Sequence, residues 1–381
     1  MKILLFPLFR MPSGHHKAAE AIIDHSKAIT RKVDVQTVDL LSHFHSGLEF
    51  IISNFYLKWI SKQPTSYSRF YHSFMYSNKV KPSYSSPIVL WNKYFEWRLE
   101  NFIKEENPDL IICTHCYPSK LFNDLKQQGK VNTPVVNVYT DFFINDVWGK
   151  TYIDYHFVPH QEAKKQLVEQ YRLKAEQVFV TGIPVHPSFY QHKEQHVKQY
   201  ILIAGGNSGL GNLKTLLNQL VKEHNQYHYK VLCGNNNKLY DWILSLDHDQ
   251  IEPIAYTSCR QQMNHYYDEA AAIITKPGGI TITEVLEKAL PVFILSALPG
   301  QEEINIQYLK SKHLIYELDV HQAIEQQLSQ VLNNKVEQSK WMKRLLQYHQ
   351  EKEDSISNCL INIIEKQNQP FAHPYKKSAP M

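Results

Sequence analysis

The sequence predicts an α/β protein in which two doubly wound parallel sheets follow one another along the chain. Apolar segments of strand length alternate with helical patterns over the N-terminal half and again over the C-terminal half. Segments as apolar as "DLIICTH" and "VVNVYT" suit parallel strands that are covered on both faces. Between the halves, "TGIPVHPSFYQHKEQH" interrupts the alternation with prolines and a polar run, which is typical of a linker.

Ten segments are predicted to be strands. The first sheet is expected to contain residues 2–9, 33–38, 109–115, 135–140 and 178–181, and the second residues 200–206, 229–234, 251–256, 271–279 and 291–296. We therefore predict a first domain over residues 1–187, a linker over 188–198 and a second domain over 199–345. A C-terminal helix is expected over 346–366, followed by a disordered tail over 367–381.

Length and composition exclude several classes of protein. A chain of 381 residues with 43% apolar and 20% charged residues can bury two cores of ordinary size. Its apolar runs are far shorter than the ~20 residues of a membrane span, and "MKILLFPLFR" is too short for a signal peptide. Five cysteines do not indicate a disulfide framework, and "CTHC" lacks the second pair that a zinc site needs. A net charge of +4 does not indicate nucleic acid, so we expect a cytoplasmic protein that does not bind it.

Glycine-rich turns follow several predicted strands, at the position where doubly wound sheets bind ligands. "GGNSGLGN" follows the first strand of the second domain and opens a helix. Gly205 and Gly206 would let the backbone approach a phosphate beside Asn207, and the helix N-terminus would supply free N–H groups. A flexible turn without a ligand is an equally supported alternative.

"TKPGGITITE" is a more informative turn. After Lys276, the pair Gly278 and Gly279 forms the turn, and Thr281 can cap the next helix. Glu284 then lies about one turn into the helix, where its carboxylate could accept hydrogen bonds from both hydroxyls of a ribose. The alternative is a capping box in which Glu284 serves only Thr281.

"LPGQEEINIQYL" follows a later strand and starts another helix. It places Gln301, Glu302 and Asn305 at fixed spacing, and amides and carboxylates can both bind sugar hydroxyls. Taken alone, this motif is more typical of an ordinary polar helix start.

Together these motifs resemble the donor-binding half of one glycosyltransferase family. "ITKPGGITITE", "PVFIL" and "PGQEEIN" are similar to segments of the monogalactosyldiacylglycerol synthases of plants and the processive diacylglycerol β-glucosyltransferases of Gram-positive bacteria. In the first domain, "GHHKAAEAI", "NVYTDFFINDVW" and "VFVTGIPVHPSF" resemble the family's Gly-His turn, Thr-Asp-Phe segment and linker. The resemblance covers roughly residues 2–345. A more distant relative adds N-acetylglucosamine to the peptidoglycan lipid carrier.

This resemblance implies a GT-B architecture of two facing Rossmann-like domains, with a UDP-sugar bound by the second. Diphosphate contacts are implied for Gly205, Gly206, Gly278 and Gly279, and ribose contacts for Glu284. Donor-sugar contacts are implied for Gln301, Glu302 and Asn305, while Tyr256 lies near the loop that packs on uracil. No metal and no cofactor besides the UDP-hexose substrate is expected, because helix dipoles and backbone N–H groups can carry the charge of the leaving UDP.

The turn "SGHH" is the predicted place of the general base. An inverting transferase needs a base for the acceptor hydroxyl, and histidine has a suitable pKa. His15, after Gly14, matches the family's histidine, and we expect His16 to point elsewhere. Pro12 replaces a family glycine, and Asn145, near Asp141, stands where bacterial relatives can carry histidine. These differences lie on the expected acceptor side.

Residues 51–100 contain thirteen aromatic residues, seven Lys or Arg and two Glu. This composition suits an anionic membrane surface, although many of the rings could belong to the core. The leading interpretation is an inverting UDP-hexose transferase, peripheral on the inner face of the cell membrane, that acts on a lipid, most simply diacylglycerol. The alternatives are a lipid-linked peptidoglycan precursor, a small hydrophobic metabolite as acceptor, or a non-catalytic UDP-sugar sensor. Both glucose and galactose fit the donor motifs.

Overall fold

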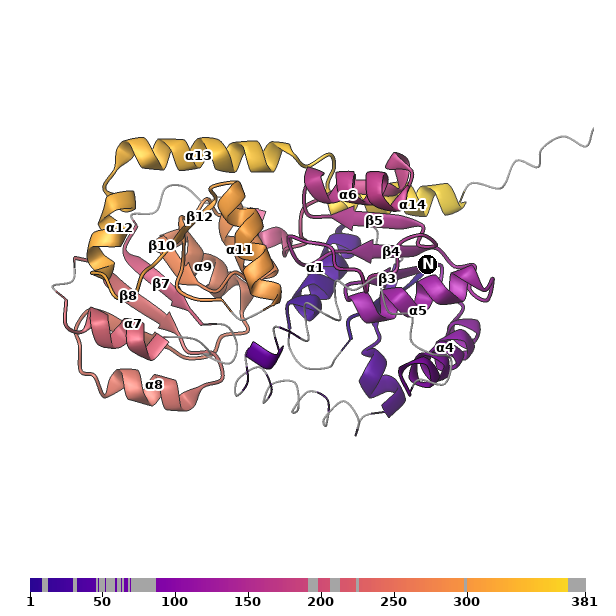
Figure 1. Cartoon of the computed structure of the whole chain (residues 1–381), viewed down its shortest axis with the longest axis horizontal. Coiled ribbons are helices and arrows are strands. Elements are labelled where there is room, and N and C mark those ends of the chain that lie inside the picture. The colour runs from indigo at the N-terminus through magenta and orange to yellow at the C-terminus, as the bar shows by residue number, and fades with distance from the viewer. Residues whose placement is uncertain are drawn as a thin grey trace, which may run out of the picture.

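Within the residues that the structure describes, two parallel six-stranded sheets, each flanked by helices, form the two halves of the molecule (Figure 1). The structure is a computed structural model. It describes residues 1–8, 13–29, 33–45, 47, 52, 59, 63, 65–67, 69, 87–190, 198–205, 213–223, 226–297 and 300–368. The predicted fold class, two Rossmann-like domains in tandem, is confirmed.

The first sheet has the strand order β2-β1-β3-β4-β5-β6. Its strands are β1 (Lys2–Phe6), β2 (Asp34–Thr37), β3 (Leu110–Cys113), β4 (Val135–Val138), β5 (Tyr155–Val158) and β6 (Val178–Val180). Its helices are α1 (Gly14–Ile29), α4 (Pro87–Glu106), α5 (Cys116–Gln127) and α6 (Gln161–Tyr171), and short 3₁₀ turns cover Ala175–Gln177 and Pro187–Tyr190. The order reverses between β1 and β3, which places the start of α1 at the switch point of this sheet.

Among the described strands of the first sheet, β5 is the one that sequence patterning missed. Its sequence, "YHFV", contains a histidine, which weakens the apolar signal. In the structure His156 is fully buried, and its Nδ1 lies 3.1 Å from the hydroxyl of Tyr139. Tyr139, which directly follows β4, therefore satisfies one ring nitrogen of this buried imidazole, whereas Nε2 has no hydrogen-bond partner among the described residues.

The second sheet has the strand order β12-β11-β10-β7-β8-β9. Its strands are β7 (Tyr200–Ala204), β8 (His228–Leu232), β9 (Ile251–Ile254), β10 (Ala270–Thr275), β11 (Val292–Ile294) and β12 (Ile315–Glu317). Its helices are α7 (Leu213–Leu220), α8 (Asn237–Leu244), α9 (Arg260–Glu269), α10 (Gly279–Glu287), α11 (Gln301–Ser311) and α12 (Ile324–Leu332). The order reverses between β7 and β10. The edge strand β12 was not predicted, because three residues ending in an exposed glutamate carry little strand signal.

The C-terminal segment forms two helices where one was predicted, α13 (Lys335–Gln350) and α14 (Ile356–Asn368). α13 runs along the second domain towards the first, and α14 lies on the first domain (Figure 1). Ile356 and Leu360 of α14 belong to the same buried cluster as Ile3 and Ile22. The end of the described chain therefore completes the core of the first domain. Residues 369–381 and 191–197, which include most of the predicted tail and linker, lie outside the described residues.

One hydrophobic cluster spans both domains. Ala18 of α1 and Phe142, which follows β4, are buried in the same cluster as Ile280 of α10 and Tyr308 of α11. The ring of Phe142 stacks on that of Tyr308, with a centroid separation of 5.5 Å. Apolar burial of this kind holds the two sheets in one relative position, so the cleft between them has defined walls.

Candidate active site

A cavity of about 870 Å³ lies between the two domains. Ala204 at the end of β7 and Thr275 at the end of β10 contribute to its floor, where the order of the second sheet reverses. Doubly wound folds bind ligands at this position. The lining includes Ser13, His16, Lys17 and Glu20 from the first domain, and Tyr256, Arg260, Lys276, Gly278, Thr281, Glu284 and Glu302 from the second.

The turn before α10 brings the backbones of the two domains into contact. α10 begins at Gly279, and Gly278 is its N-cap residue. A Cβ atom on Gly279 would lie 2.1 Å from the carbonyl oxygen of Thr140, so a larger residue would push the domains apart. Because the helix already begins at Gly279, Thr281 lies inside the first turn and is not the N-cap. The capping-box alternative for Glu284 is therefore excluded.

Glu284 lies in the wall of the cavity, with 7% of the residue exposed. Its Oε2 accepts a hydrogen bond of 3.0 Å from the hydroxyl of Tyr267. Burial raises the pKa of Glu284, and the positive charge of Lys17 and the bond from Tyr267 oppose this shift. A carboxylate that uses one lone pair on Tyr267 keeps enough acceptor capacity for the two hydroxyls of a ribose.

Other predicted donor residues line the same cavity. Lys276 follows β10, and burial lowers its pKa while the carboxylate of Glu302 raises it. Tyr256 follows β9 and is 52% exposed, so its ring is accessible for stacking on a base. Gly205 is described and buried at the end of β7, whereas Gly206 and Asn207 lie outside the described residues.

Gln301 and Asn305, at the start of α11, contact the first domain. Nε2 of Gln301 donates a hydrogen bond of 2.5 Å to Asp141, and Nδ2 of Asn305 donates one of 3.0 Å to the same carboxylate. Asn305 is fully buried, donates also to the carbonyl of Pro277, and accepts from the backbone N–H of Phe142. In this structure its amide therefore joins the domains, and a sugar hydroxyl would have to replace one of these bonds.

His15 lies at the switch point of the first sheet, in the first turn of α1. Its Nδ1 is 2.8 Å from the carbonyl oxygen of Thr114, directly after β3, and 2.9 Å from the hydroxyl oxygen of Thr140. Since Nδ1 donates to the carbonyl, the neutral ring carries its lone pair on Nε2. Burial lowers the pKa of His15, and the nearby carboxylate of Asp141 opposes this. The ring of His115 packs edge-on against it at 4.6 Å.

His16 lines the cavity, whereas the described contacts of the His15 ring are with the first domain. Nε2 of His16 lies 2.6 Å from Oδ1 of Asp39, and Nδ1 lies 3.5 Å from the hydroxyl of Ser13. We expected His16 to point elsewhere, and the structure corrects this, since it places the residue at the cavity wall. Of the two histidines, His16 is therefore the one that lines the cavity, while His15 lies beside it and contacts Thr114, Thr140 and His115 of the first domain.

The two remaining acceptor-side residues have structural contacts. Asn145 is buried, and its Oδ1 accepts a hydrogen bond of 3.0 Å from the N–H of Val147, which shapes the loop after β4. Gly14 is exposed, and a Cβ atom there would lie 3.3 Å from a side-chain carbon of Ile280 in the other domain. Pro12 lies outside the described residues.

Comparison with known proteins places these features in a family. Residues 15–185 match the family described as monogalactosyldiacylglycerol (MGDG) synthase, and residues 200–360 match the glycosyltransferase family 28 C-terminal domain. An uncharacterized glycosyltransferase, YkoN, of Bacillus subtilis (strain 168) is 36% identical over 373 residues, which cover 96% of this chain and 98% of that protein. A processive diacylglycerol beta-glucosyltransferase of Bacillus cereus (strain G9842) is 30% identical over 73% of this chain and 72% of its own.

The chain belongs to the monogalactosyldiacylglycerol synthase and processive diacylglycerol β-glucosyltransferase family. It is a glycosyltransferase, as the resemblance of its motifs implied. The structure of Phytolacca americana UGT2 complexed with UDP-2fluoro-glucose and pterostilbene shares its GT-B fold, with a TM-score of 0.59 and 10% identity over 97% of this chain and all of the other.

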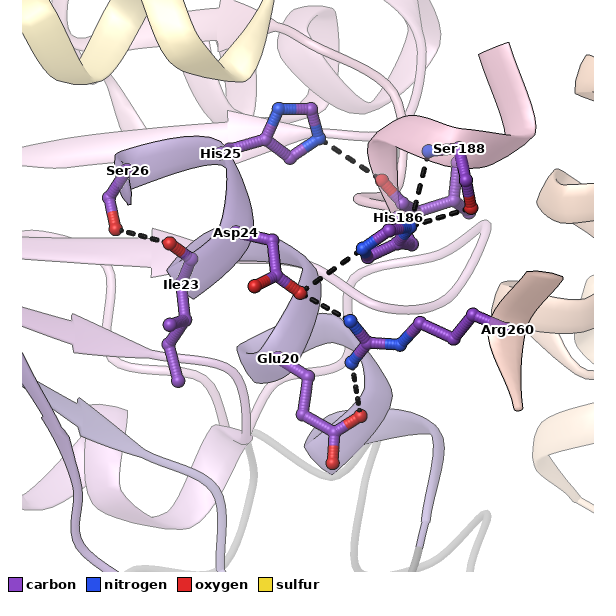
Figure 2. A network of polar contacts seen from close by, with 9 residues as sticks. Glu20, Ile23, Asp24, His25, Ser26, His186, Ser188 and Arg260 are labelled. Carbon is purple, nitrogen blue, oxygen red and sulfur yellow. Dashed lines mark hydrogen bonds and ion pairs between the residues drawn. The ribbon is translucent and has the colours of Figure 1, made fainter. Parts of the chain in front are cut away.

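A network of ion pairs joins α1 of the first domain to the start of α9 in the second domain of this glycosyltransferase (Figure 2). Arg260, the first residue of α9, pairs with Asp24 and, at 2.7 Å, with Glu20, both on α1. The carboxylate of Asp24 also lies 3.3 Å from Nε2 of His186. Nδ1 of the same ring accepts a hydrogen bond of 3.1 Å from the N–H of Ser188. Sequence analysis missed this network. Glu20 and Asp24 are four residues apart, a spacing typical of the polar face of any helix, so it does not indicate a partner in the other domain.

Much of the aromatic and basic region, residues 51–100, lies outside the residues that the structure describes. In its described part, α4 buries Phe95 fully but leaves Leu90 and Trp97 60% and 55% exposed. These two residues are seven positions apart and share a face of the helix. None of the helices that the structure describes is long and apolar enough to span a bilayer.

Proposed function

We propose that the protein is an inverting transferase that moves a hexose from a UDP-hexose to a hydroxyl group of a membrane lipid, most simply diacylglycerol. The observation that carries the proposal is the composition of the interdomain cavity. Its second-domain wall contains Tyr256, Glu284 and Glu302, for which the family resemblance implies contacts with a UDP-sugar. Lys276 and Thr281, from the same turn as Glu284, line this wall as well. Diacylglycerol is named in the description of one relative, the Bacillus cereus enzyme, and we extend it to this chain.

In this proposal the second domain holds the donor. Glu284 accepts hydrogen bonds from the ribose hydroxyls, and the exposed ring of Tyr256 stacks on the uracil. The diphosphate lies at the N-terminus of α10, where the backbone N–H groups and the positive end of the helix dipole favour negative charge. Lys276, at the end of β10, adds a positive side chain there.

The first domain supplies the base. With Nδ1 of His15 held by the Thr114 carbonyl, Nε2 takes the proton of the acceptor hydroxyl as its oxygen attacks the anomeric carbon. The bond between that carbon and the diphosphate oxygen breaks on the opposite face, and UDP leaves with the bonding electrons. An α-linked donor therefore gives a β-glycoside. Burial, which lowers the pKa of His15, keeps the imidazole neutral and able to accept a proton at neutral pH.

The acceptor lies in a bilayer, so the enzyme has to dock on a membrane. We place the docking surface on the first domain, around the face of α4 that exposes Leu90 and Trp97. Lys93, exposed on the same helix, adds a positive charge near this face. Apolar insertion together with basic residues is the usual way in which a protein binds the anionic surface of the cytoplasmic leaflet.

The test is mass spectrometry of lipids after incubation of the purified protein with vesicles that contain diacylglycerol and with UDP-glucose, UDP-galactose or UDP-N-acetylglucosamine. We expect a hexosyl-diacylglycerol from one of the first two donors. Product only from vesicles that carry a lipid-linked peptidoglycan precursor, or only from a soluble hydrophobic alcohol, would replace diacylglycerol as acceptor. UDP binding without any product would favour a non-catalytic sensor.

A further inference from the structure

Three Lys or Arg residues line the cavity within the part of the chain that the structure describes: Lys17, Arg260 and Lys276. Lys276 belongs to the donor motif, and Arg260 is part of the ion-pair network that joins the domains. Lys17 belongs to neither group. It lies in the first turn of α1, on the wall of the cavity that faces the donor-binding domain.

Arg260 is already neutralised. Its guanidinium is bound by two carboxylates of α1, Glu20 and Asp24, and the second of these is shared with His186 (Figure 2). An anionic ligand would have to displace two carboxylates to use this charge. The arginine is therefore suited to holding the cleft together rather than to binding phosphate.

Lys17 is in a different situation. The residue is exposed to the cavity, and within the part of the chain that the structure describes its ammonium has no hydrogen bond and no ion pair. Its positive charge acts on Glu284 across the cleft and lowers the pKa of that carboxyl. The ammonium therefore lies near the group that is proposed to hold the ribose, and so near the phosphate that the ribose carries.

We propose that Lys17 is a further catalytic residue, which binds the diphosphate of the donor from the acceptor domain. This inference rests on the proposed function, since it needs a UDP-sugar in the cavity. The second domain approaches the diphosphate through α10, and Lys17 approaches it from the opposite wall, beside the start of α1. The two helix starts are close, because a Cβ atom on Gly14 would touch Ile280 of α10 at 3.3 Å.

The positive charge of Lys17 would act most strongly at the step in which UDP leaves. When the bond to the anomeric carbon breaks, the departing diphosphate oxygen gains negative charge, and a nearby ammonium stabilises that charge more strongly than it stabilises the intact donor. Lys17 lies on the first domain, so the donor would contact both walls of the cavity. Removal of its charge should therefore lower kcat as well as affinity.

The experiment compares the affinities of UDP and uridine, measured by calorimetry, for the wild type, Lys17→Met and Lys17→Arg. A charge-assisted contact is worth ~1.5–3 kcal/mol, so Lys17→Met should bind UDP about 10- to 100-fold more weakly while its affinity for uridine stays unchanged. Lys17→Arg, which keeps the charge, should recover most of the UDP affinity. Since the side chain is exposed, the variants should fold. Lys165→Met is a matched control, because it removes an exposed positive charge of the same domain that does not line the cavity, and it should leave UDP affinity unchanged.

The outcomes separate this inference from the function on which it rests. If the wild type binds UDP and Lys17→Met binds it equally well, the role of Lys17 is refuted while the donor site stands. If Lys17→Met loses UDP and uridine affinity to the same extent, Lys17 acts through Glu284 and not on phosphate, which also refutes it. If the wild type does not bind UDP at all, the proposed function itself fails.

Discussion

The replacement of Glu284 tests the donor site most sharply. Its carboxylate is buried in the cavity wall and has one described hydrogen-bond partner, the hydroxyl of Tyr267. Hydrogen bonds from the two ribose hydroxyls to the carboxylate should contribute ~2 kcal/mol to the binding free energy of UDP after the cost of desolvation is subtracted. We therefore expect Glu284→Ala to weaken UDP binding about 30-fold. Glu284→Gln, which keeps the size of the side chain but not its charge, should lose about half of that free energy.

Calorimetry with UDP and with a 2′,3′-dideoxy analogue of UDP isolates the ribose contact. If Glu284 binds the hydroxyls, the analogue should bind the wild type and Glu284→Ala with equal affinity. If Glu284→Ala binds both UDP and the analogue more weakly than the wild type by the same factor, the ribose assignment is refuted. Glu287 is a matched control, because it is buried on the same helix but pairs with Lys352 and does not line the cavity. Its replacement by glutamine should reduce stability and leave UDP affinity unchanged.

The burial of Glu284 predicts that one substitution at this position changes protein stability and UDP affinity in opposite directions. Since burial raises the folded-state pKa of Glu284, this group stabilises the protein below its unfolded pKa, and that stability is lost as the pH rises through the folded pKa. At neutral pH Glu284→Gln should therefore have a higher Tm than the wild type, although it binds UDP more weakly. In the wild type, UDP affinity should fall on acidification at a pH above the ordinary pKa of a glutamate. A lower Tm for Glu284→Gln would contradict this account of its burial.

Three further predictions concern the base, the domain contact and the membrane. His15→Ala should reduce transfer by ~10²–10⁴-fold with UDP affinity near that of the wild type, and an inactive His16→Ala beside an active His15→Ala would reassign the base. On acidification the transfer rate should fall only below pH 6.5, because the pKa of His15 is lowered from that value. Asn305→Ala should cost ~3 kcal/mol in urea unfolding, since it leaves buried backbone groups of both domains unpaired, and an unchanged midpoint would show that the contact is dispensable. Trp97→Ser should reduce binding to anionic vesicles about tenfold in co-sedimentation, whereas Leu244→Ser, exposed on the other domain, should not; equal effects would place the docking surface elsewhere.

The sequence predicts the fold well because parallel strands that are covered on both faces are continuously apolar. The exceptions are informative. His156 interrupts the apolar pattern of β5, although the strand is paired on both sides and the histidine contacts the buried hydroxyl of Tyr139. α14 reads as a separate terminal helix, yet it packs on α1 and β1, and a contact between residues more than 300 positions apart has no local signal.

The candidate site could be predicted where its residues follow one strand or turn. Glu284 and Lys276 are examples, because a single β10–α10 unit carries both of them into the cavity. Contacts between the domains could not be predicted in this way. Gly279 was interpreted as a phosphate-binding residue, but its close approach to Thr140 also requires a glycine. Asn305 was interpreted as a sugar ligand, and the structure adds a bond to Asp141 of the other domain.

The most direct test of the central claim is proton NMR of the lipid that forms from an α-linked UDP-hexose and diacylglycerol vesicles. The proposed attack on the face opposite to the leaving UDP predicts a β-glycoside, whose anomeric proton shows the large coupling of a trans-diaxial pair. Formation of this lipid should be lost in His15→Ala and strongly reduced in Glu284→Gln. An α-glycoside would contradict the inverting mechanism, and release of free hexose in place of a lipid product would contradict transfer to a membrane acceptor.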